Sequence, residues 1–159
     1  MQNKVIQELE SKVLMQDFKL NSLLEITNAI NTNQPVEQLT KILGFILKEQ
    51  LGFDKFILFT KQDNWRSLLK TGIKGKVKNI DVEKDLFRFK EITVIESSPS
   101  KILNEFDVVV PVFHKSLPLA YLLIAGLEHE KLRLKETLSN ISFIQTLVNV
   151  IVVAVENKR

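Results

Sequence analysis

The most informative segment of the chain is DVVVPVFHKSLPLAYLLIAG, residues 107–126. Two apolar runs, Asp107–His114 and Leu117–Gly126, flank the dipeptide Lys115-Ser116, which predicts a hairpin of two strands. Both strands are apolar on both faces, so another layer must cover each face of the sheet to which they belong. The segment therefore predicts a sheet that is sandwiched between two layers.

The sequence before this hairpin predicts the rest of the sheet. Asp63-Asn64 is a turn signal after a short aromatic and apolar run, and Ser98-Pro99 is typical of the start of a short helix that continues to Phe106. Further strands are expected at Phe53–Lys61, Trp65–Thr71, Leu86–Phe89 and Ile92–Ile95. We expect an α+β fold around an antiparallel sheet of five to six strands, with loops and the short helix covering one face.

The first segment, Lys4–Asn31, contains no glycine or proline and predicts a long helix. Its apolar residues recur in steps of three and four if Gln16 and Thr27 are counted, which is the heptad period of a left-handed coiled coil. The resulting seam, predicted to pair with a second copy, consists of Ile6, Leu9, Val13, Leu20, Leu23 and Ile30. The alternative is a helix that lies on its own domain, packed through residues off the seam, namely Leu14, Phe18, Leu24 and Ile26.

Two more helices are predicted. Pro35 begins one of them after a break at Asn31–Gln34, and Gly52 follows its end. The last segment, Leu134–Lys158, contains a β-branched run that suits a strand, but its heptad period and its length without glycine or proline favour a helix. Its predicted seam toward a second copy comprises Leu138, Ile141, Val148, Val152 and Val155. We expect the terminal helices to pack together on one face of the sheet.

Composition excludes several classes of function. The net charge is only +3, with lysine and glutamate mixed along the chain, which argues against nucleic-acid binding. The absence of cysteine excludes disulfides, thiol catalysis and thiolate metal sites, and it fits the cytoplasm. The most apolar stretch, Ile141–Val155, would span about 22 Å as a helix, less than the roughly 30 Å of a bilayer core, so we expect no membrane span.

No catalytic pattern is found. His114 and His129 are too isolated for a metal site, and Asp81, Glu83 and Asp85 lack the glycine turn and closing glutamate of a calcium loop. We expect no catalytic residue, no metal and no cofactor. Three aromatic residues could line a small-molecule pocket on the loop-covered face, with core packing as the alternative: Phe87, Phe89 and Tyr121.

In their order and spacing, several pieces of the chain resemble GAF domains. Residues Leu23–Ile30, Val36–Leu39 and Leu51–Phe56 resemble the N-terminal segments of that family. Residues Val109–Val112 and Leu119–Gly126 resemble its central hairpin. Its closing helix is similar to Ile141–Leu147 with Ala154–Asn157. Leu119-Ala120 replaces the small glycine usual before the second hairpin strand, and the region Gly72–Phe106 is shorter than in ligand-binding members.

The resemblance implies a profilin-like GAF fold and a non-catalytic sensory or regulatory role in a longer signalling protein, such as a regulator of the serine phosphatase type. We expect a helix for signalling at 1–33, a core at 34–133 and a dimerisation helix at 134–159. Two copies would pair in parallel and relay a signal to an attached output domain. The alternative is a structural dimerisation or protein-interaction module without a small-molecule ligand.

Overall fold

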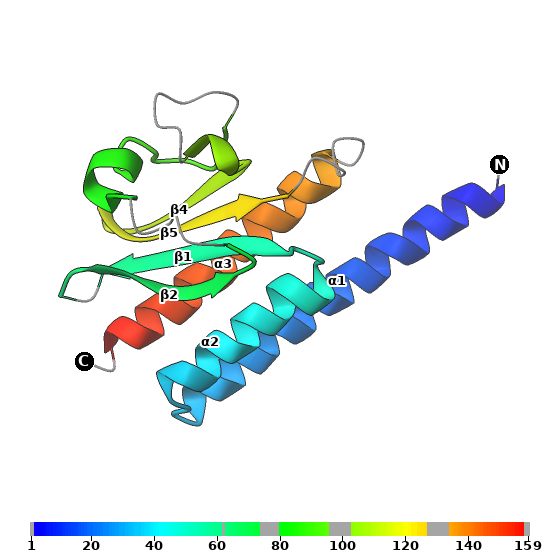
Figure 1. The fold of residues 1–159 in the computed structure, drawn as a ribbon. Coiled ribbons are helices and arrows are strands. Elements are labelled where there is room, and N and C mark those ends of the chain that lie inside the picture. The colour runs from blue at the N-terminus through cyan, green and yellow to red at the C-terminus, as the bar shows by residue number, and fades with distance from the viewer. Residues whose placement is uncertain (1, 62, 74–79, 96–102, 127–133, 158–159) are drawn as a thin grey trace.

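The computed structural model describes residues 2–61, 63–73, 80–95, 103–126 and 134–157 (Figure 1). Its helices are α1 (Gln2–Asn31), α2 (Val36–Phe45) and α3 (Leu134–Asn157). Its strands are β1 (Lys55–Lys61), β2 (Trp65–Thr71), β3 (Thr93–Val94), β4 (Val108–His114) and β5 (Leu117–Ala125). Short turns of helix occupy Ile46–Gln50, Val82–Leu86 and Leu103–Glu105.

The five strands form one antiparallel sheet in the order β2-β1-β5-β4-β3. The predicted hairpin is confirmed as β4 and β5, and Lys115 and Ser116 at its turn have φ angles of 52° and 69°. Two consecutive positive φ angles match the twist of a two-residue hairpin loop, although neither residue is the glycine or asparagine that such loops prefer. The hairpin thus forms because of its strands rather than its turn.

Both faces of the sheet are covered, as the sequence predicts. Leu58, Val110 and Leu122 face a core that they share with the three helices, all of which lie on one side of the sheet (Figure 1). Ile57 and Leu123 face a second core on the opposite side, which the segments between β2 and β4 complete. The strands of the central hairpin are apolar on both faces because each face contributes to a separate core.

One prediction between β2 and β4 is wrong, and another is confirmed only in part. Leu86–Phe89 is not a strand: Val82–Leu86 is a π-helical turn, and Asp81 begins it by accepting a hydrogen bond from the Lys84 N–H (3.3 Å). The strand expected at Ile92–Ile95 is reduced to Thr93–Val94. Of the predicted helix from Ser98 to Phe106, residues 98–102 lie outside the described residues, and Leu103–Glu105 is a 3-10 turn.

The last segment is a helix, as its period predicts. Figure 1 shows α3 and α1 running in the same direction beside each other, while α2 runs the opposite way. The first half of α1 extends past the sheet and past α2. Among the described helices, α3 contains a stretch, Asn140–Asn157, that is long and apolar enough to cross a membrane, and 50% of it is buried in the protein. Its apolar character is therefore explained by its place in the core.

Candidate functional site

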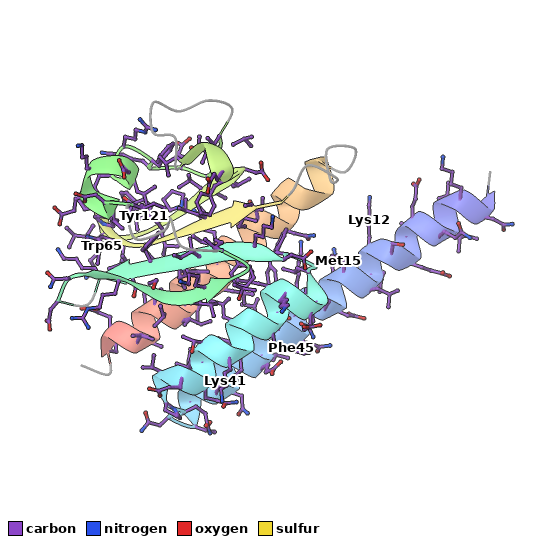
Figure 2. All side chains as sticks on the ribbon, viewed as in Figure 1. Lys12, Met15, Lys41, Phe45, Trp65 and Tyr121 are labelled. Carbon is purple, nitrogen blue, oxygen red and sulfur yellow. The ribbon has the colours of Figure 1, made fainter. Side chains whose placement is uncertain are left out.

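An aromatic cluster lies on the face of the sheet opposite the helices. Tyr121 of β5 is fully buried at its centre, and Trp65, the first residue of β2, lies over it with ring centroids 5.6 Å apart (Figure 2). Phe87 follows the turn Val82–Leu86 and stacks on Tyr121 at 6.2 Å, and Phe113 of β4 meets it edge-on at 6.4 Å. Trp65 and Phe87 also touch each other, at 5.8 Å. Three rings from separate segments thus surround the one side chain of the cluster that carries a hydroxyl.

Two polar atoms in this cluster are buried without a hydrogen-bond partner in the part of the chain that the structure describes: the Tyr121 hydroxyl and the Trp65 Nε1. Such atoms are rare because each costs about 1–3 kcal/mol when left unpaired. Burial raises the pKa of Tyr121 to about 12, since the phenolate would lose its hydration. The cluster therefore offers one donor and one hydroxyl to an uncharged group.

The structure brings together two of the three residues predicted to line a pocket, Phe87 and Tyr121. Phe89 packs on the same core, but its ring lies under the Arg88 guanidinium, 4.7 Å from the ring centroid. Sequence reasoning missed Phe113, and it placed Trp65 only as the first residue of an expected strand. Trp65 does begin β2, but its ring also covers Tyr121. Strand β1 lies between β2, which carries Trp65, and β5, which carries Tyr121. That strand order is the signal from which the contact could have been predicted.

A second candidate surface lies on the helical side. Four residues of the seam predicted on α1 have exposed fractions of 51% to 56%: Ile6, Leu9, Val13 and Leu20. Leu23 and Ile30 are half-buried against the core. Of the off-seam residues, Phe18 and Ile26 pack on the domain, whereas Leu14 and Leu24 are exposed. The N-terminal half of α1 thus presents an apolar stripe that its own domain does not cover.

The seam predicted on α3 has a different place. Four of its residues are buried in the chain's own core: Ile141, Val148, Val152 and Val155. The side chain of Leu138 lies outside the described residues. The four buried residues have no surface left for a second chain because the sheet, α1 and α2 already cover them. The interface proposed below is therefore built without them.

An open groove of about 450 Å³ separates the C-terminal parts of α1 and α3. Its walls include Thr27 and Ile30 of α1, His114 at the end of β4, and Val150 and Val153 of α3. Thr27 and Ile30 also continue the heptad series of the exposed stripe, so the groove lies at the C-terminal end of that series. From Ser142 to Val153, α3 carries no charged side chain, a composition typical of the centre of an interface.

An exposed aromatic residue also lies away from this surface. Phe45 on the outer face of α2 is 53% exposed, and Figure 2 shows it on α2 with Lys41, while Lys12 and Met15 lie on the first half of α1. A single exposed phenylalanine among lysines is common on protein surfaces and does not make a site by itself.

In the described part of the chain, no group of three or more histidine and carboxylate side chains is placed to hold a metal. Asp81 and Asp85, considered above as calcium ligands, instead cap the turn between them: the Asp81 N–H donates to the Asp85 carboxylate at 3.0 Å. His129 lies outside the described residues.

No protein-family model matches the sequence, and no curated protein matches it. Eight chains of solved structures resemble the fold, among them the two that follow. The GAF domain of a sensor histidine kinase from Pseudomonas syringae pv. tomato has a TM-score of 0.65 and 12% identity, over 94% of this chain and 93% of that one. Residues 122 to 287 of a methyl-accepting chemotaxis protein have a TM-score of 0.52 and 12% sequence identity, over 82% of this chain and 98% of that one. At these identities the likeness shows a GAF-like α+β fold, which confirms the fold implied by the sequence resemblance.

Proposed function

We propose that the chain is a non-catalytic regulatory domain that self-associates through its helices and relays a signal to an attached output domain. Its fold is that of a domain from a sensor histidine kinase and of part of a chemotaxis protein, which supports a signalling role. The observation that carries the proposal is the exposed apolar stripe on the projecting half of α1. In this proposal the domain acts in the cytoplasm, which its lack of cysteine fits.

The proposed interface combines the α1 stripe with the groove and the uncharged face of α3. A second copy that covers these surfaces would remove from water the exposed apolar side chains of the stripe, including Leu9, Val13 and Leu20. Because these side chains are about half exposed, covering each one stabilises an assembly by roughly half of the 1.5–3 kcal/mol of full burial, before the cost of association. Thr27 and Ile30 line the groove and continue the heptad series of the stripe, so one partner helix can follow both.

The proposed relay connects the aromatic cluster to α3. Tyr121 is paired across the hairpin with Pro111, whose carbonyl oxygen accepts a hydrogen bond from the Gln145 side chain of α3 at 2.7 Å. Helix α3 in turn contacts α1, where Phe18 meets Phe143 edge-on at 6.1 Å. A shift of Tyr121 would therefore reach both helices through two contacts, and α1 and α3 would pass it to the second copy and the output domain.

The proposed signal is a small uncharged molecule with a hydrogen-bond acceptor, held by the Trp65 N–H and the Tyr121 hydroxyl. The two unpartnered polar atoms favour this reading. One observation favours the alternative, a dimerisation module without a ligand: the four rings already contact one another at 5.6 to 6.4 Å. A ligand would have to displace Phe87, which is the most exposed of them at 36%.

Native mass spectrometry of the purified chain distinguishes these readings. We expect the mass of two chains, with a retained small molecule that is lost in the Tyr121→Phe and Trp65→Phe variants. Two chains with no added mass would support the structural module, and a single chain at all concentrations would contradict self-association.

The relay is tested by a double-mutant cycle with Tyr121→Phe and Gln145→Ala, with the dimer dissociation constant as the readout. We expect non-additive effects, because each change acts on the same pair of contacts. Additive effects would show that the aromatic cluster and α3 are not coupled.

A further inference from the structure

We propose that α1 pairs with α1 of a second copy in parallel and in register over Ile6–Leu23. This inference rests on the proposed self-association and adds the register of the two chains and the α1 side chains that determine both the register and the parallel orientation. The relevant segment is the projecting half of α1, where Figure 2 labels Lys12.

The projecting half of α1 has little support from its own domain. Every side chain from Asn3 to Asp17 is exposed. Isolated helices shorter than about 12–15 residues are only marginally stable in water, and most helices depend on packing of an apolar face. A partner that packs on Ile6, Leu9 and Val13 would supply that support.

The charges beside the stripe determine the orientation. With Ile6, Val13 and Leu20 at heptad position a, the acidic residues Glu10 and Asp17 take position e, while Lys12 and Lys19 take position g. In a parallel pair, a g residue faces the e residue five positions later in the partner, which sets Lys12 against Asp17 of the second copy.

An antiparallel pair would place like charges together. It sets e against e and g against g, so that Glu10 and Asp17 would meet each other and Lys12 would meet a lysine. Lys19 already lies over the Phe143 ring of its own chain, 5.7 Å from the centroid, so Lys12 is the lysine placed to pair with the second copy. The charge pattern therefore favours the parallel pair and opposes the antiparallel one.

Gln16 determines the register. It occupies position d between Leu9 and Leu23, where a polar side chain is costly unless it meets a hydrogen-bonding partner. In register, Gln16 faces Gln16 of the second copy, and a pair of amides can both donate and accept. A shift of one heptad would place it against leucine on both chains, so the polar position penalises the wrong registers.

Cysteine cross-linking tests the inference cleanly because the chain has no cysteine of its own. In a parallel, in-register pair, each a and d position meets its own copy within the roughly 4.4–6.8 Å Cα separation of a disulfide. We expect mild oxidation to cross-link almost completely both the Leu9→Cys variant and the Val13→Cys variant at the neighbouring a position, because both variants keep Gln16 in place. The matched control is Ser11→Cys, which lies on the outer face of the same helix and should remain uncross-linked.

The other outcomes overturn the inference. Cross-linking at only one of the two seam positions would indicate an antiparallel or shifted pair, and equal cross-linking at Ser11→Cys would show that the stripe is not the contact. Dimers in sedimentation that cross-link at neither seam position would overturn the pairing but leave self-association intact. Monomers under reducing conditions would contradict the proposed function as well.

A charge exchange provides a second readout. Lys12→Asp should weaken dimerisation about tenfold, because a two-fold pair contains this contact twice and each attraction becomes a repulsion. Lys12→Asp combined with Asp17→Lys should restore the original affinity, and the loss should diminish in high salt. Equal weakening by the single and double variants would contradict the assigned ion pair.

Discussion

At the scale of single residues, Tyr121 is the most unusual group in the described structure. Its hydroxyl is buried among aromatic rings, it has no partner among the described residues, and its pKa is raised to about 12. It is also the only tyrosine in the sequence, and Trp65 the only tryptophan. Absorbance and fluorescence of the whole protein therefore report on this one cluster.

Removal of the Tyr121 hydroxyl should stabilise the ligand-free protein. Tyr121→Phe removes an unpaired polar atom, so we expect about 1 kcal/mol of added stability in urea unfolding at neutral pH. The raised pKa has a second consequence. It contributes stability that is present in full below about pH 10 and is lost as pH rises through about 12, because the unfolded tyrosine ionises first.

The Tyr121→Phe variant should lack this loss of stability at alkaline pH. Urea unfolding of the variant and the parent across the same pH range measures the difference. An equal loss in both proteins would mean that ionisation of Tyr121 does not cause it, and a variant less stable at neutral pH would mean that the hydroxyl has a partner in the folded chain.

Val148 and Leu20 lie on predicted seams of the same period but in opposite environments. Val148 is fully buried, whereas Leu20 is 55% exposed. Val148→Glu places a charge in the core and should cost several kcal/mol, enough to abolish cooperative unfolding. Leu20→Glu should keep the helix content and the fold. Circular dichroism during thermal unfolding measures both, and a well-folded Val148→Glu protein would contradict the placement of α3.

At the scale of elements, the turn of the central hairpin is poorly matched to its conformation. Lys115 and Ser116 both adopt positive φ, which asparagine and glycine tolerate better. Replacement of the pair by Lys115→Asn with Ser116→Gly should stabilise the protein by about 1 kcal/mol. Chemical unfolding of the parent and the double variant measures the gain. A loss of stability would mean that the native side chains make contacts that outweigh the strain.

The sequence predicted some elements well and others poorly for identifiable reasons. Along residues 107–126, apolar and polar residues alternate too little for strands with one exposed face. The sequence therefore predicted a sheet that is covered on both faces. The segment around Val82 and Leu86 has apolar residues at a spacing that suits either a strand or a turn of helix. What decides for the turn is the reciprocal capping by Asp81 and Asp85, a contact between side chain and backbone that apolar periodicity does not contain.

At the scale of the whole molecule, a heptad period does not reveal what covers a helix. Leu9 of α1 and Val148 of α3 share that period, yet Leu9 is exposed and Val148 is in the core. The flanking residues differ: the first half of α1 has charges on both sides of its stripe, whereas α3 has none from Ser142 to Val153. The aromatic cluster was only partly predictable because Trp65, Phe87 and Phe113 come from separate segments that meet in the fold.

The central claim, that two copies join through the projecting half of α1, is tested most directly by sedimentation equilibrium of one exposed double substitution. Leu9→Glu with Val13→Glu changes two stripe residues without touching the core, and Leu14→Glu changes a leucine off the stripe that is even more exposed. We expect dimers of the parent and of Leu14→Glu and monomers of the double variant, all folded. Dimers of the double variant with the parent's affinity would contradict the account.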